Sequence, residues 1–143
     1  MNTLPTDPTP NKMMAEVHYY GPWQFCGLTE DATWGTMFYY WGNGYHSTTD
    51  PSRNATWGEE DYVIAEFQKM KTKFVNQGIP VVLGEYGVIR RTTLTGAALT
   101  LHLASRAYWD NCYLTNHEFG IFNRQNYTVG DQHVLDALVQ GAQ

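Results

Sequence analysis

An apolar run at residues 79–83 (IPVVL), with Gly84 and Glu85 directly after it, constrains the fold of this chain more than any other feature. A continuous aliphatic run is typical of a strand that is buried on both faces of a parallel sheet. Parallel strands need a crossover connection of a dozen or more residues, usually a helix. The run therefore predicts an α/β fold in which helices cover the sheet.

The rest of the chain supplies the other elements of such a fold. Residues 13–20 (MMAEVHYY) predict a first strand, and the capping-box pattern at 56–59 (TWGE) predicts the start of a helix that ends near Gly78. We expect further helices at 95–107 and from about Asp131 onward. The residues expected to face inward on the first and last helices are Val63, Phe67, Met70, Phe74, Val134, Leu135, Leu138 and Val139. The alternation of strand and helix indicates an α/β domain.

Two segments lack this periodicity. Residues 1–12 hold three prolines and predict an extended N-terminal arm. Residues 21–57 are rich in Gly, Trp, Tyr and Thr and are too long for an ordinary connector, so they predict an ordered functional loop. We interpret residues 1–143 as a single domain.

Composition narrows the choice of partner. The net charge is −5 and no basic run extends beyond Arg90 and the following arginine, so nucleic acid is excluded as a partner. The sequence contains no apolar stretch of about 18 residues, so it predicts no membrane span. No signal peptide is recognisable. Aromatic residues reach 15%, with 5 Trp and 10 Tyr, and their flat faces suit sugar rings, protein interfaces or core packing. Cys26 and Cys112 match no metal or redox motif, and their pairing stays open.

Polar groups follow both predicted strands at the edge where parallel α/β sheets bind ligands. His18 and Tyr20 share one face of the first strand, since side chains alternate with a period of two. Glu85 ends the second strand between two glycines, where burying a carboxylate is costly without partners. Two interpretations stay open: a catalytic cluster, or a salt bridge at a sheet edge beside a core histidine.

Five stretches, found in order along nearly the whole chain, resemble the C-terminal portion of glycoside hydrolase family 5 endoglucanases: MAEVHYYGPWQFCG, TMFYYWGNGYHSTTD, GIPVVLGEYGVIRR, YWDN and FGIFNRQNYTV. The resemblance implies an eight-stranded TIM (β/α)8 barrel, of which this chain would form about half. It implies retaining cleavage of β-1,4-glucans, with Glu85 as the nucleophile flanked by His18 and Tyr20. It also implies that Trp109 lies beneath the sugar at the cleavage point, on a strand end or a helix end.

Other features complete the expected site. Trp23 and Trp41 are our candidates for stacking on glucan, with His46 in the same cleft; the alternatives are loop packing and a turn histidine. The expected ligand is a β-glucan polysaccharide or a cello-oligosaccharide, with no metal or organic cofactor. The resemblance also implies a secreted, extracellular protein.

The chain lacks one part of the family pattern. The Asn-Glu pair whose Glu is the general acid/base of the family does not occur in this sequence. Half a barrel also exposes strand edges and apolar faces, which predicts a homo-oligomer. A neighbouring copy would then supply the second carboxylate, for which the candidates are Glu16, Glu30, Glu59, Glu60, Asp110 and Glu118. The alternative is a non-catalytic, self-associating remnant that at most binds glucan.

Overall fold

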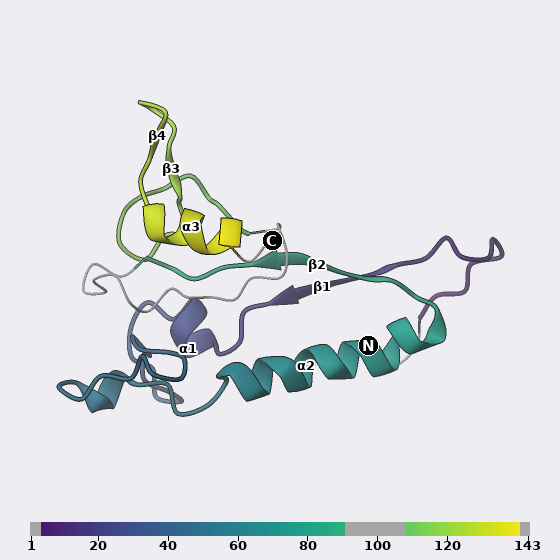
Figure 1. Ribbon diagram of the computed structural model, residues 1–143, viewed down its shortest axis with the longest axis horizontal. Coiled ribbons are helices and arrows are strands. Elements are labelled where there is room, and N and C mark those ends of the chain that lie inside the picture. The colour runs from purple at the N-terminus through teal and green to yellow at the C-terminus, as the bar shows by residue number, and fades with distance from the viewer. Residues whose placement is uncertain (1–3, 91–107, 141–143) are drawn as a thin grey trace.

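Two parallel strands form the centre of the computed structural model, which describes residues 4–90 and 108–140 (Figure 1). Strand β1 (Ala15–Tyr19) pairs with β2 (Val81–Tyr86). The register runs from Ala15 opposite Val81 to an irregularity after Val17, which places His18 opposite Glu85. The predicted parallel pairing is therefore confirmed, and the shift aligns the two polar strand ends.

Helix α2 (Glu60–Lys73) and the short 3-10 helix η2 (Val75–Gln77) carry the chain from the end of β1 back to the start of β2. Gly78 follows in the left-handed conformation (φ 79°), which glycine adopts without strain, so the predicted stop is confirmed. Figure 1 shows α2 lying along the strands, and the rings of Tyr19 and Phe67 meet at 5.9 Å between centroids.

The face of the sheet that carries Glu16 and His18 is open. Val82 lies on this face and is 38% exposed, and the side chains of Glu16 and His18 are 61% and 53% exposed. The prediction that residues 79–83 are buried on both faces is therefore wrong for this chain. The described sheet has only two strands here, and no described element covers that side.

The main hydrophobic cluster is formed by the long segment after β1, which is ordered as expected, together with Val88 after β2. This segment contains the short helices α1 (Trp23–Cys26) and η1 (Pro51–Arg53). The buried side chains of the cluster are Phe25, Cys26, Phe38, Trp41, Ala55 and Val88. This cluster lies beyond the carboxyl ends of the strands (Figure 1), so it supports the loops around them.

The C-terminal part packs against the end of β2. Tyr108 forms a parallel bridge with Tyr86, and a hairpin of β3 (Phe122–Asn123) and β4 (Thr128–Val129) follows. Helix α3 (Gln132–Gln140) begins where predicted. Val134 is buried, but Val139 is 53% exposed, so its predicted inward position is wrong. The helix expected at 95–107 lies outside the described residues.

Three smaller expectations can be compared with the structure. Residues 4–12 form neither helix nor strand and are largely exposed, and their role as an extended arm stays a prediction. Cys26 is buried and Cys112 is exposed, and the two are not bonded to each other. Among the helices of the described residues, none is long and apolar enough to cross a membrane.

Candidate active site

Glu85 lies near the carboxyl end of β2 with both carboxylate oxygens engaged. The Tyr20 hydroxyl donates to Oε1 at 2.5 Å, and His18 Nδ1 lies 3.0 Å from Oε2. The Glu85 side chain is 26% exposed, so it remains accessible from one side. The structure brings together the three residues that the sequence singled out.

Tyr20 is held as a hydrogen-bond donor. Burial, together with the hydrogen bond to Glu85, raises the pKa of its hydroxyl well above the usual value. The ring packs edge-on against Trp23 and Phe119, each at 6.2 Å between centroids. The phenol therefore stays protonated and fixed, pointing at the carboxylate.

A second carboxylate lies behind His18. Glu16 Oε1 is 3.3 Å from His18 Nε2, so the imidazole stands between Glu16 and Glu85. The Glu16 side chain crosses Gly84, where an added Cβ would lie only 2.0 Å from Oε1. Glycine at this position thus makes room for the Glu16 carboxylate. The imidazole donates to both carboxylates only when both ring nitrogens carry protons.

Trp109 directly follows the bridge that Tyr108 forms with β2. Its backbone N–H donates to the Tyr86 carbonyl at 2.8 Å, directly after the bridge formed by Tyr108. Its side chain is 47% exposed, and that of Trp23 is 46% exposed. Each of these partly exposed indoles follows a segment that pairs with β2. Trp23 comes after β1, and Trp109 comes after the Tyr108 bridge.

The structure places Trp41 and His46 in other surroundings. Trp41 is only 8% exposed, stacks on Phe25 at 5.9 Å, and donates from Nε1 to the Gly58 carbonyl. Because its faces are occupied by the core, Trp41 supports the loop. His46 Nε2 lies 2.6 Å from Glu59 Oε1, in a groove at the start of α2.

The candidates for the second carboxylate also differ in whether they lie near Glu85. Among these candidates, all of which lie in the described residues, Glu16 alone forms an ion pair with a residue of the Glu85 cluster. Glu118 accepts a hydrogen bond from Asn111, and Asp110 pairs with Arg124 at 3.8 Å. Sequence reasoning missed Phe119, which packs on Tyr20 and would lie 2.9 Å from a Cβ at Gly87. No local pattern marks Phe119, because its contact joins residues 99 positions apart along the chain.

Comparison with known proteins identifies the class. A family model described as Cellulase (glycosyl hydrolase family 5) matches residues 1–129. Endoglucanase A of Paenibacillus barcinonensis is 35% identical over 92% of this chain, which covers 34% of that protein. A xyloglucan-specific endo-beta-1,4-glucanase of Bacteroides ovatus is 35% identical over 73% of this chain, which covers 19% of it.

Solved structures agree. A family 5 xyloglucanase from Paenibacillus pabuli, determined with a ligand, superposes with a TM-score of 0.78 at 36% identity; the match covers 99% of this chain and 43% of that one. A broad-specificity endoglucanase from Bacteroides salanitronis gives a TM-score of 0.73 at 31% identity, covering 97% and 38% of the two chains.

Parallel strands joined by a helix, with a carboxylate held at the strand ends, place the chain in the TIM (β/α)8-barrel class. More particularly, the chain belongs to glycosyl hydrolase family 5, the cellulase family. It spans about a third of the length of Endoglucanase A and less than half of the xyloglucanase of known structure. It therefore corresponds to part of a barrel.

Proposed function

We propose that this chain carries the nucleophile of an endo-β-1,4-glucanase that cleaves internal bonds of cellulose or related β-glucans with retention. One observation carries the proposal: the Glu85 carboxylate stands at a strand end between the Tyr20 hydroxyl and His18 Nδ1. The names of its relatives, endoglucanases and xyloglucanases, support this class of substrate.

The chemistry follows from the geometry. In a retaining mechanism one carboxylate attacks the anomeric carbon while the bond to the leaving oxygen breaks, and water later cleaves the glycosyl–enzyme ester. One Glu85 oxygen would form that ester, and Tyr20 and His18 would orient the carboxylate for attack. Trp109 and Trp23 are partly exposed beside it and are our candidate platforms for the sugar rings.

The acid/base partner must come from outside the matched motifs. Retention requires a second carboxyl group about 5–5.5 Å away, and the sequence has no Asn-Glu pair. We infer that a second copy of the chain supplies it and covers the open face around Val82, forming a homo-oligomer. By analogy with the family, we propose that the enzyme acts outside the cell.

The test is release of reducing sugar from carboxymethyl cellulose by the full chain and by Glu85→Ala. We expect the variant to lose all measurable release. Azide should restore cleavage because it replaces the missing nucleophile, and mass spectrometry detects the product, since a glycosyl azide has no reducing end. Glu66→Ala is the matched control, since Glu66 lies on α2 in a surface pair with Lys69. Release that survives Glu85→Ala would assign the nucleophile elsewhere.

The second candidate function is glucan binding without hydrolysis. The observation that favours it is the missing Asn-Glu pair, because loss of general acid help lowers rates by about 10²–10⁴-fold. Cellulose pull-down of the unaltered chain separates the two functions. Retention on cellulose with no sugar released identifies the binding function, whereas release abolished by Glu85→Ala identifies the enzyme.

A further inference from the structure

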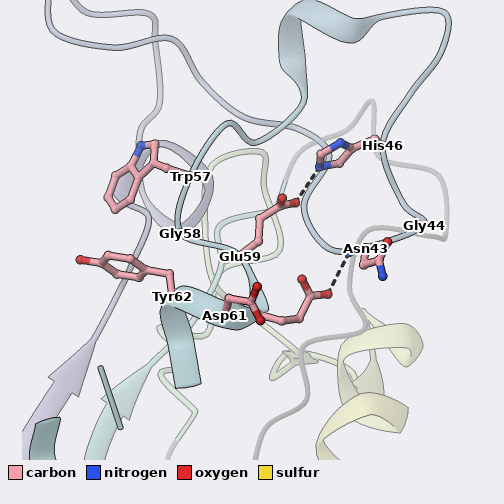
Figure 2. Close-up of a pocket in the computed structure, with 9 residues that line it drawn as sticks. Asn43, Gly44, His46, Trp57, Gly58, Glu59, Asp61 and Tyr62 are labelled. Carbon is pink, nitrogen blue, oxygen red and sulfur yellow. Dashed lines mark hydrogen bonds and ion pairs between the residues drawn. The ribbon is translucent and has the colours of Figure 1, made fainter. Parts of the chain in front are cut away.

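A second groove lies at the start of α2, on the loops around residues 43–46 and 57–59 (Figure 2). Its volume is about 770 Å³, within the usual range for small-molecule sites, about 300–1,000 Å³. Figure 1 shows that α2 begins at the end of the sheet where β1 and β2 terminate. The groove thus opens at the same end of the fold as Glu85, and its lining includes none of the Glu85 contacts.

One wall of the groove is aromatic. Trp57 and Tyr62 are 42% and 41% exposed, and their rings meet edge to face at 5.4 Å and 85°. Figure 2 shows both side chains on one side of the groove. Because each ring packs against the other, both side chains are already ordered, and a ligand that binds their exposed faces loses little side-chain entropy. Such faces match the apolar faces of pyranose rings.

On the opposite wall, carboxylates hold the loop in place before any ligand binds. Glu59 accepts the Gly42 N–H at 2.8 Å and lies 2.6 Å from His46 Nε2. Glu60 accepts the Asn43 N–H, also at 2.8 Å. These contacts tie the loop around residues 42–46 to the helix start, so the groove does not need to order its own wall when a ligand enters.

One carboxylate remains for a ligand. The Asp61 side chain is exposed and makes no hydrogen bond or ion pair with any part of the chain that the structure describes. In Figure 2 it lies between the aromatic pair and Asn43. Glu59 and Glu60 are already occupied by loop N–H groups, and the described residues hold no His, Cys, Asp and Glu cluster arranged for a metal.

We propose that this groove binds a neutral saccharide chain. The aromatic pair would stack on ring faces, while Asp61 and Asn43 would bond to hydroxyl groups, and three neighbouring carboxylates would repel anionic sugars. The saccharide class follows from the lining alone. That the saccharide is the same β-1,4-glucan rests on the function proposed above.

The groove and the Glu85 cluster are supported by the same packed loop. The Gly58 carbonyl, between the two walls, accepts from Trp41 Nε1 at 2.9 Å. Gly58 has a φ of 79°, and a Cβ there would lie 2.7 Å from Pro22, two residues after Tyr20. A saccharide in the groove is therefore held on the same packed loop that positions the Tyr20 hydroxyl.

The experiment measures binding of cellohexaose to the full chain carrying Glu85→Gln, so that hydrolysis plays no part. We expect Trp57→Ala in this background to weaken binding about tenfold or more. Trp34→Ala is the matched control, because Trp34 is 61% exposed but does not line the groove. Equal affinity of the Trp57 and Trp34 variants would overturn the proposal.

A second measurement keeps the test valid if Trp57→Ala does not fold. Cellohexaose should shift the NMR signal of the Trp57 indole N–H and leave that of Trp34 in place, and Asp61→Asn should weaken binding. Oligogalacturonate, an anionic saccharide, should produce no shift. An unmoved Trp57 signal at saturating cellohexaose refutes the groove, while the Glu85 assignment is unaffected because activity is not measured here.

Discussion

At the scale of single residues, the Tyr20 hydroxyl is the most directly testable contact of the proposed site. Tyr20→Phe removes one donor from the Glu85 carboxylate and leaves the ring packing of Trp23 and Phe119 in place. Hydrogen bonds to charged groups contribute about 1.5–3 kcal/mol. We therefore expect kcat/KM on carboxymethyl cellulose to fall about 10–100-fold.

The neighbouring Tyr19 provides the control for this change. Its side chain points to the other face of β1, toward Phe67, and its buried hydroxyl has no hydrogen-bond partner in the described chain. Tyr19→Phe should leave activity unchanged. An equal loss of activity in both variants would mean that Tyr20→Phe acts through general destabilisation of the strand and not through Glu85.

Tyr19 also predicts how stability depends on pH. Burial, the largest cause, raises the pKa of its hydroxyl to about 12, above the value of about 10 for an unfolded chain. A raised folded-state pKa favours the protonated folded form. Its contribution is therefore complete below pH about 10 and is lost as the pH rises toward about 12.

Urea denaturation at pH 8 to 12 tests this contribution. The free energy of unfolding should fall less steeply above pH 10 in Tyr19→Phe than in the unaltered chain. Tyr127→Phe is the control, because Tyr127 is 92% exposed, and its curve should follow that of the unaltered chain. A Tyr19→Phe curve with the unaltered slope would contradict the assignment.

Some residue positions followed from the sequence and others did not. The period of two along β1 placed His18 and Tyr20 on one face, and the strand-end rule brought Glu85 to them. Tryptophans in the long loop have no such period. Trp41 packs in the core and Trp57 lines the groove, and the spacing of residues along the sequence does not predict either contact.

At the scale of elements, the start of α2 shows why a local motif was misread. A capping box implies that the Thr56 side chain caps the N-terminus of the helix. In the structure Glu59 is the N-cap residue, and its side chain makes no capping hydrogen bond. Its carboxylate instead reaches Gly42 and His46. The helix itself was predictable from its apolar stripe, whereas this long-range use of its first carboxylates was not.

Glu59→Ala should release the loop that the helix start holds. We expect faster hydrogen exchange at the Gly42 amide and a loss of about 1.5–3 kcal/mol in stability, because a carboxylate bonded to an amide and an imidazole is removed. Glu66→Ala, farther along the same helix in a surface pair with Lys69, should change stability much less, because solvent screens such a pair. Unchanged Gly42 exchange in Glu59→Ala would show that the loop is held by other contacts.

At the scale of the whole molecule, the open sheet face is the main departure from a closed barrel. A complete barrel buries both faces of its strands and has no edges. Here Val82, Glu16 and His18 face outward on a sheet of two strands. The apolar run 79–83 was correctly predicted as part of a parallel strand, but no element of the described residues covers its second face.

This face predicts the assembly state. If a second copy covers it, Val82→Asp should place a charge inside the interface and convert the oligomer to monomer. Val129→Asp is the matched control, because Val129 is 39% exposed against 38% for Val82 but lies on β4. Light scattering at micromolar concentration reports the mass of each. A monomer mass for the unaltered chain, or an oligomer that tolerates Val82→Asp as well as Val129→Asp, would show that a second copy does not cover this face.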